Sequence, residues 1–330
     1  MLGKSLVTLA ALLLAGTASA ATTVTNFDLE GATTTIAYSI NKSGQVAGTG
    51  IESSGTMHGF VRAADGTVAV HDVPDTHGTE VFAINADGAI VGHYFDNTVF
   101  HSHGFVEAAD GTLAKFDVPG STGTTPHAIN DKGWTTGYYT DSNAVGHGFV
   151  RSAKGKIVTF DPADSQQNFP QAINDRNAVA GYYYDNNARP QAYVRAADGT
   201  ITKITPAGSI SSFAEAINAG GVVAGSWADG NFTPHGFVRA ADGTITAFDV
   251  VGATATYARS INRQGVIAGD YLDANGVSHG FLRHVDGRIV TFDPQGSVST
   301  HAWGINRAST VVGGFGDGHA GHGYLRAHAQ

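Results

Sequence analysis

The sequence predicts an all-β fold, a seven-bladed β-propeller in which every blade is a sheet of four antiparallel strands. Three observations lead to this prediction. An Ile-Asn pair recurs seven times, four runs of strand-forming residues fill each repeat, and the two ends of the chain hold complementary parts of one repeat. Four strands in about 40 to 45 residues is typical of a propeller blade.

The repeat is regular along almost the whole chain. Successive Ile-Asn pairs are 44 or 45 residues apart, and a glycine follows eight residues after each isoleucine. The pairs begin at Ile40, Ile84, Ile129, Ile173, Ile217, Ile261 and Ile305. Since this period leaves little room for a second domain, we expect residues 21–330 to form one propeller of about 44-residue repeats.

Each repeat contains four strand-like runs, and the sixth repeat shows them well. Its runs are YARSIN, VIAGDYLD, VSHGFLRHV and RIVTFDP. Val, Ile, Tyr, Phe and Thr favour strands, whereas Gly, Asn and Asp favour the turns between them. An Asp-Gly pair such as Asp286-Gly287 favours a tight hairpin, because glycine adopts positive φ without strain.

The two ends of the chain predict that the ring closes. The C-terminus stops after a third-strand sequence, HGYLRAHAQ, one strand short of a full blade. Residues 22–29, TTVTNFDL, match the fourth-strand sequence GTITAFDV and have no third strand before them. We therefore expect residues 22–29 to complete the last blade, which would cover the strand edges that an open array exposes.

The first 20 residues have the pattern of a secretory signal peptide. Lys4 precedes a short apolar core from Leu6 to Ala15, and Ala18-Ser19-Ala20 is a small-residue cleavage site. The alternative is a buried N-terminal helix. Cleavage near Ala20 would make the protein secreted or periplasmic, and no other stretch is long and apolar enough to span a membrane.

Composition narrows the function classes. The net charge is −9, and the 19 Lys and Arg residues form no cluster, so the sequence predicts no nucleic-acid partner. Cysteine is absent, so stability must come from packing without disulfides.

The combined motif FDVPGATxT…IN…G…GxY…HGF resembles the HAF-family extracellular repeat. The resemblance covers the chain after the signal peptide, with His-Gly-Phe in place of the family's His-Ala-Phe and one divergent copy, Gln191-Ala192-Tyr193. It implies secretion and a repeat fold, and it implies no particular reaction.

The repeated histidines are interpreted as scaffold. Six histidines on six blades cannot converge on one metal ion, and strands about 4.8 Å apart place the third strand far from the axis. We expect each imidazole to bond the Asp of a Phe-Asp pair or its counterpart in the same blade. The fourth repeat lacks both partners, with Gln191 and Thr205 in their places. The histidines of the motif are His58, His103, His147, His235, His279 and His322.

The positions just before the Ile-Asn pairs differ from repeat to repeat, and a site that holds one ligand must be asymmetric. We therefore predict a ligand site in the central funnel for a polar ligand with apolar faces, an extracellular saccharide or a protein segment. The candidate ligand-binding residues are Tyr38, Glu80, Phe82, His127, Gln171, Glu215, Arg259, His301 and Trp303.

Two other interpretations stay open beside this binding or interaction module. An extracellular propeller lyase or hydrolase would use Glu215, Arg259, His301 and His127, although Glu215 and Arg259 could simply pair with each other. A structural surface or matrix protein would need no ligand. We predict no metal or cofactor; loops such as Asp185-Asn186-Asn187 and Asp273-Ala274-Asn275 suggest Ca²⁺ but hold fewer carboxylates than a calcium loop needs.

Overall fold

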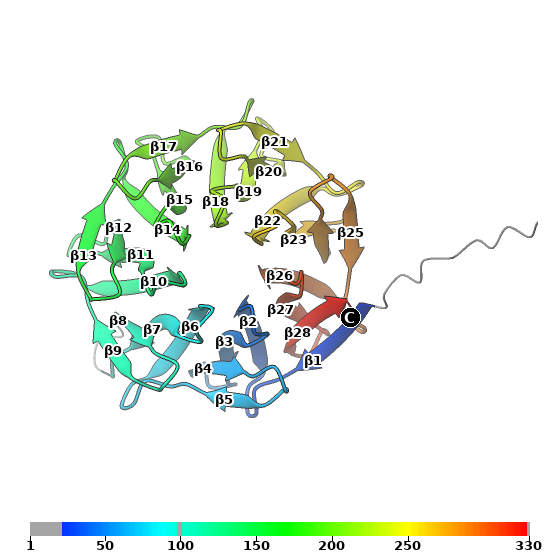
Figure 1. The fold of residues 1–330 in the computed structure, drawn as a ribbon. Coiled ribbons are helices and arrows are strands. Elements are labelled where there is room, and N and C mark those ends of the chain that lie inside the picture. The colour runs from blue at the N-terminus through cyan, green and yellow to red at the C-terminus, as the bar shows by residue number, and fades with distance from the viewer. Residues whose placement is uncertain (1–21, 98–100, 329–330) are drawn as a thin grey trace, which may run out of the picture.

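The structure is a computed structural model that describes residues 22–97 and 101–328, so the predicted signal peptide lies outside the described residues. The described chain forms 28 strands, β1 to β28, and Figure 1 shows them as a ring of sheets around a central axis. The innermost strand of each sheet is the one that carries the Ile-Asn motif: β2, β6, β10, β14, β18, β22 and β26. The expected seven-bladed propeller is confirmed.

The first four blades follow one another along the chain, each with its strands paired in sequence order. Blade 1 is β2 (Thr34–Ile40), β3 (Val46–Ile51), β4 (Met57–Arg62) and β5 (Val68–Val70). Blade 2 is β6 (Gly78–Ile84), β7 (Ile90–Phe95), β8 (Ser102–Glu107) and β9 (Leu113–Phe116). Blade 3 is β10 (Gly123–Ile129), β11 (Thr135–Thr140), β12 (Gly146–Arg151) and β13 (Ile157–Phe160). Blade 4 is β14 (Gln167–Ile173), β15 (Val179–Tyr184), β16 (Pro190–Arg195) and β17 (Ile201–Ile204).

The last three blades repeat this order, except that the final strand comes from the other end of the chain. Blade 5 is β18 (Ser211–Ile217), β19 (Val223–Ala228), β20 (Pro234–Arg239) and β21 (Ile245–Phe248). Blade 6 is β22 (Ala255–Ile261), β23 (Ile267–Leu272), β24 (Ser278–Arg283) and β25 (Ile289–Phe292). Blade 7 is β26 (Ser299–Ile305), β27 (Val311–Gly316), β28 (Gly321–His328) and β1 (Thr22–Phe27).

The ring closes as the chain ends predicted. Strand β1 pairs antiparallel with β28 from Thr22 opposite His328 to Phe27 opposite Gly323, and Figure 1 shows the two strands side by side. The strand is two residues shorter than the expected 22–29. A single parallel bridge between Thr34 and Gly321 also joins blade 7 to blade 1. The N-terminal strand therefore covers an edge of β28 that would otherwise be open to pairing with another chain.

Every inner strand contains a β-bulge, and the bulge explains the repeated glycine. In blade 5 the pairing register shifts between Ala214 and Ala216, so Glu215 is the extra residue. The distortion brings the carbonyl oxygen of Phe213 against Gly225, where a Cβ atom would overlap it. Gly48, Gly92, Gly137, Gly181, Gly269 and Gly313 meet the equivalent carbonyl in the other blades. A side chain at this position would push the two inner strands of its blade apart.

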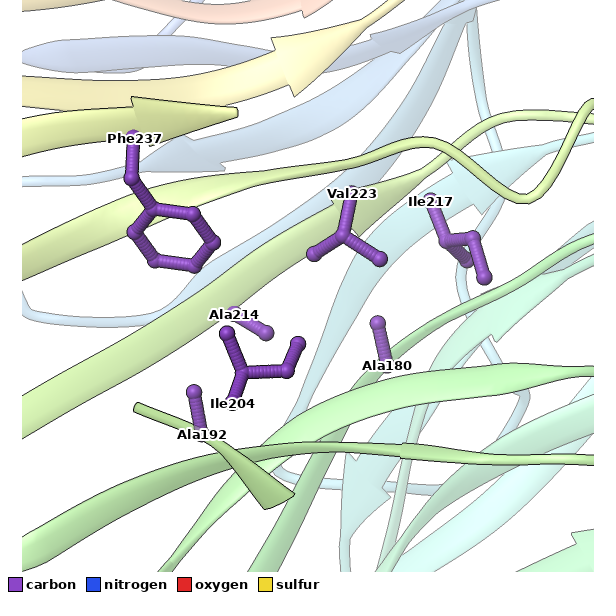
Figure 2. Packing of buried hydrophobic residues seen from close by; sticks show 7 residues of the cluster. All are labelled: Ala180, Ala192, Ile204, Ala214, Ile217, Val223 and Phe237. Carbon is purple, nitrogen blue, oxygen red and sulfur yellow. The ribbon is translucent and has the colours of Figure 1, made fainter. Parts of the chain in front are cut away.

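Apolar side chains between adjacent blades form the core. Figure 2 shows one such interface, where Ile204 of β17 packs among residues that include Phe237 of β20. The aromatic residue of the third-strand triplet is fully buried in all seven blades. In five of them it contacts the fourth-strand Phe of the preceding blade edge to face. The centroid distances are 5.9 Å for Phe27–Phe60 and 6.0 Å for Phe248–Phe281. Such pairs add to the stabilisation that burial provides.

The interface between blades 1 and 2 replaces this apolar contact with a polar one. His71 occupies the fourth-strand Phe position, and Glu107 occupies the third-strand position that is Arg in every other blade. In five of the other blades that Arg lies over the Phe ring of the preceding blade, as Arg283 lies over Phe248 at 4.8 Å. Here His71 Nδ1 lies 2.8 Å from Glu107 Oε1 instead. The replacement of Phe by His in one blade is thus matched by the replacement of Arg by Glu in the next, because the two new side chains bond each other.

The asparagines of the Ile-Asn motif link the seven blades into a ring of hydrogen bonds. Each side-chain Nδ2 donates to the main-chain carbonyl of the next asparagine, from 2.9 Å for Asn130 to Asn174 up to 3.3 Å for Asn306 to Asn41. The other links join Asn41 to Asn85, Asn85 to Asn130, Asn174 to Asn218, Asn218 to Asn262 and Asn262 to Asn306. All seven side chains are buried, so the links are shielded from water.

The six triplet histidines bond the aspartates that the sequence predicted, so these bonds are confirmed and support the scaffold interpretation. His58 Nδ1 lies 2.7 Å from Asp72 Oδ2 in blade 1, and in the last blade His322 reaches Asp28 of β1 at 3.0 Å. The Nε2 atom of each imidazole faces a second carboxylate, such as Glu52 at 3.3 Å from His58. The bond to Asp72 is the main reason that the pKa of His58 is raised. In blade 4, Gln191 replaces the histidine and donates to Asp185.

Candidate functional site at the channel mouth

The variable residues just before the Ile-Asn pairs are the bulge residues. Each is the fifth residue of a seven-residue inner strand, which places it deeper in the channel than the strand entry that the sequence suggested. An extra residue in one strand turns its side chain away from the regular alternation. We call these residues the axial belt: Tyr38, Phe82, His127, Gln171, Glu215, Arg259 and Trp303.

Neighbouring belt side chains touch one another around the channel. The Arg259 guanidinium lies 5.0 Å from the Trp303 ring, and the Trp303 and Tyr38 rings are 6.3 Å apart. Tyr38 lies 5.6 Å from Phe82, which stacks on His127 at 5.0 Å. Burial is the main cause that raises the pKa of Tyr38, to about 12. Five of the seven belt side chains therefore form a continuous run of contacts, most of them between aromatic rings.

A second ring of side chains lies between the belt and the mouth where the inner strands begin, and we call it the upper ring. It includes residues that the sequence analysis did not identify. The inner-strand residue two before each bulge pairs with the residue that follows the repeated glycine on the second strand, as Glu80 pairs with His93. The second-strand members are Thr49, His93, Tyr138, Tyr182, Ser226, Asp270 and Gly314. Their variation from repeat to repeat is the same signal that marked the inner strand, and it could have identified them.

An aromatic arc occupies this upper ring over blades 3 to 5. The Tyr138 and Phe169 rings are 5.1 Å apart, Phe169 and Tyr182 are 5.4 Å apart, and Tyr182 and Phe213 are 5.0 Å apart. Tyr184 joins the arc at 6.1 Å from Phe169. These contacts alternate between edge-to-face and tilted arrangements, so the arc is a packed wall with ring surfaces and hydroxyl groups along it.

The first polar cluster lies over blades 2 and 3. His93 Nε2 is 3.1 Å from Glu80 Oε2, without the alignment of a hydrogen bond, and His93 is buried. His127 stacks on Phe82 beside this pair. Burial, with a smaller effect of nearby His93, lowers the pKa of His127 to about 4. His127 is therefore neutral at physiological pH and can donate or accept a hydrogen bond there.

The second polar cluster lies over blades 5 to 7 and corrects one expectation. Arg259 does not pair with Glu215; its Nε donates to Asp270 Oδ1 at 2.9 Å within its own blade, because Asp270 stands on the adjacent strand. Burial raises the pKa of Asp270, but the nearby His301 and the hydrogen-bonded Arg259 outweigh it, so the pKa is lowered. His301 lies 3.7 Å from Asp270 and stacks on Trp303.

Glu215 has no hydrogen bond or ion pair within 4 Å among the described residues. Burial is the main cause that raises the pKa of its carboxyl group, and nearby Arg259 opposes the shift. Glu215, Arg259 and His301 are thus gathered around Asp270, whereas His127 belongs to the other cluster. Three of the four residues suggested for catalysis therefore lie together.

A hollow of about 620 Å³ opens at the rim of blade 4 beside the aromatic arc. Its walls combine ring surfaces with amides and a carboxylate, from Gln166, Gln167, Phe169, Tyr182, Tyr184, Asp185, Asn186 and Ala188. Gln166 Nε2 donates to Asn186 Oδ1 at 2.7 Å, which ties the loop between β15 and β16 to the entry of β14. The loop between the second and third strands therefore lies at the mouth where the inner strand begins, as expected.

The carboxylates suggested as calcium ligands serve the loops themselves. Asp273 Oδ1 accepts the N–H groups of Asn275 and Val277, and Asp185 does the same in blade 4. Over the ranges that the structure describes, no three His, Asp or Glu residues gather in an arrangement that could hold a metal ion. The described residues also contain no helix with the length and apolar character needed to span a membrane.

Comparison with known proteins identifies the fold. No family model and no curated protein matches the chain. Virginiamycin B lyase from Staphylococcus aureus is 16% identical over 92% of this chain and 99% of its own, with a TM-score of 0.63. A streptogramin B lyase is 14% identical over 92% and 97%, also at 0.63. The β-propeller domain of the trilobed protease from Pyrococcus furiosus is 10% identical over 90% and 96%, at 0.62. These likenesses show a shared propeller fold.

Proposed function

We propose that this protein is a secreted binding module that holds a saccharide at the channel mouth where the inner strands begin. The observation that carries the proposal is the hollow of blade 4, where Phe169, Tyr182 and Tyr184 stand beside amide and carboxylate side chains. A saccharide has apolar faces that cover aromatic rings and hydroxyl groups that need hydrogen-bond partners, so it matches both kinds of wall.

The asymmetry of the mouth supports a single ligand. The blades are alike in their bulges and glycines, and six of the seven share the triplet histidine, yet the residues of the two channel rings form an aromatic arc on one side and two polar clusters elsewhere. A protein that only needed to fill its channel would have no physical reason to separate these chemistries. The saccharide is expected to lie on the arc and to reach the belt residues below it.

Saccharide binding can be tested with the protein without residues 1–20. Oligosaccharides of several linkages would be screened by thermal shift, and each hit would be titrated calorimetrically against Tyr184→Ala and Gln167→Ala. We expect each variant to weaken binding about fivefold, since one aromatic contact or one hydrogen bond contributes on the order of 1 kcal/mol.

The matched control is Phe232→Ala, which removes an aromatic ring that is 78% exposed on the neighbouring blade and outside the hollow. It should bind like the wild type. Unchanged affinity in Tyr184→Ala would refute the assignment of the hollow. Hits confined to peptides would keep the binding module and replace the ligand class.

A lyase or hydrolase is the second candidate, and Glu215 is the observation that favours it. A carboxyl group with a raised pKa and no hydrogen-bond partner can act as a general acid or base. If Glu215→Gln abolishes turnover of a bound saccharide and leaves its affinity unchanged, the enzyme interpretation is correct. Equal behaviour of wild type and variant would refute it.

Export and the HAF-repeat resemblance remain predictions. Mass spectrometry of the protein recovered from outside the cytoplasm should give a mature chain that begins near Ala21. Recovery of the intact chain from the cytoplasm would contradict the secreted assignment.

A further inference from the structure

The opposite mouth of the channel, where the inner strands end, holds a second cavity. Its volume is about 420 Å³, and residues from all seven blades line it. The hydrogen-bonded ring of asparagines described above forms its wall and leaves the next residue of each blade at the opening. This cavity is separate from the aromatic hollow, which lies where the inner strands begin.

Charges around this opening are divided between two sides. The residue after each asparagine differs between blades: Lys42, Ala86, Asp131, Asp175, Ala219, Arg263 and Arg307 in ring order. Lys42, Arg263 and Arg307 come from the three adjacent blades 6, 7 and 1, and we call them the cationic arc. None of the three side chains makes a hydrogen bond or ion pair within the part of the chain that the structure describes.

Main-chain N–H groups of the same residues point around the opening from blade to blade. The N–H of Ala86 donates to Asp131 Oδ1 at 2.8 Å, and the N–H of Asp131 donates to Asp175 Oδ1 at 3.1 Å. A carboxylate on one blade therefore binds the N–H of the blade before it. Asp131 and Asp175 thus give two examples of a carboxylate bound to a main-chain N–H group at this opening.

In the cationic arc the same N–H groups have no acceptor among the described residues. Each inner strand ends in the same Asn-centred turn, with Asn Oδ1 accepting the N–H groups two and four residues on, as in Asn262 and Asn306. The N–H groups of Arg263 and Arg307 are therefore oriented like that of Ala86. At the positions from which an aspartate would bind these two N–H groups, the chain has Arg307 and Lys42 instead. This side of the opening therefore has N–H donors and positive side chains but no acceptor among the described residues.

We propose that this mouth binds a small polycarboxylate, with carboxylate groups on the main-chain N–H groups and side chains of the cationic arc. Charge-assisted hydrogen bonds of this kind are the strong ones. The two aspartates on the opposite side repel a long polyanion, which selects a small ligand. The carboxylates of Asp131 and Asp175 are the internal precedent for this group.

Citrate is the probe for the test, titrated calorimetrically at low ionic strength against the protein without residues 1–20. We expect Arg307→Gln to weaken citrate binding about tenfold, as the loss of one charge-assisted bond does. Arg307→Asp should abolish binding, because its carboxylate would occupy the Arg263 N–H as Asp131 occupies that of Ala86. Circular dichroism and thermal unfolding check that each variant is folded.

Lys132→Gln is the matched control, since Lys132 is an exposed cation in the equivalent turn of blade 3 and does not line the cavity. It should change citrate affinity by less than about twofold. The proposal is wrong if wild-type protein binds no citrate, if Arg307→Asp retains wild-type affinity, or if Lys132→Gln weakens binding as much as Arg307→Gln. Tyr184→Ala should leave citrate binding unchanged, which separates this site from the saccharide proposal.

Discussion

Replacement of one asparagine of the central ring should destabilise the whole propeller. Asn174 is 5% exposed and makes three side-chain hydrogen bonds. Its Nδ2 donates to the carbonyl of Asn218 at 3.0 Å, and its Oδ1 accepts the N–H groups of Arg176 and Ala178, both at 3.0 Å. Asn174→Ala removes all three bonds, one of which joins blade 4 to blade 5.

The expected loss follows from the number and burial of these bonds. A hydrogen bond contributes roughly 1 kcal/mol net, and a buried group left without its partner costs about 1–3 kcal/mol. The turn N–H groups lie near the surface, where water can replace the lost acceptor, while the Asn218 carbonyl is buried. The free energy of unfolding should therefore fall by about 3 kcal/mol.

Urea unfolding followed by intrinsic fluorescence measures this loss, and Asp273→Ala is the matched control. Asp273 caps an outer loop through the same two turn bonds, to Asn275 and Val277, but makes no link between blades. Its replacement should cost about 1 kcal/mol, because the loop is exposed. If Asn174→Ala costs no more than Asp273→Ala, the ring contributes nothing beyond local turn capping and the reasoning fails.

Three further predictions concern the scaffold. The pKa of His58 is raised in the folded protein, so protonated His58 stabilises the fold fully below the unfolded pKa of about 6.5, and this stabilisation is lost as pH rises through the folded pKa. The difference in the free energy of unfolding between wild type and His58→Gln should therefore shrink from pH 6 to pH 9. A constant or growing difference would contradict this. Gly225→Ala places a methyl group on the Phe213 carbonyl and should prevent folding or lower the melting temperature strongly, whereas Gly230→Ala, with nothing within 4 Å, should not; equal melting temperatures would refute the bulge argument. Deletion of residues 22–27 exposes the edge of β28 and should produce oligomers in size-exclusion chromatography; a stable monomer with the wild-type melting temperature would show that closure by β1 is dispensable.

Residues of the candidate site could be predicted from the sequence only by comparing equivalent positions of the repeats. All nine predicted ligand residues surround the channel, because variation at a fixed register marks positions without a common packing demand. The same comparison at the residue after the repeated glycine would have found His93, Tyr182 and Asp270. The bulge could not be foreseen, since it depends on how two paired strands share an extra residue, and it moved the predicted register deeper into the channel.

The sequence by itself determined the period, the four strands of each repeat and the pairing of His with Asp, because these features recur in most or all copies. It also determined the closure by the N-terminal strand, because the two chain ends are complementary parts of one copy. Tertiary structure decided which groups from different copies meet. Arg259 of blade 6 bonds Asp270 of its own blade and not Glu215 of blade 5. The Asn174 side chain reaches the Asn218 carbonyl 44 residues further along the chain. A repeat records what each copy must do alike, whereas contacts between copies exist only once the ring has brought their strands together.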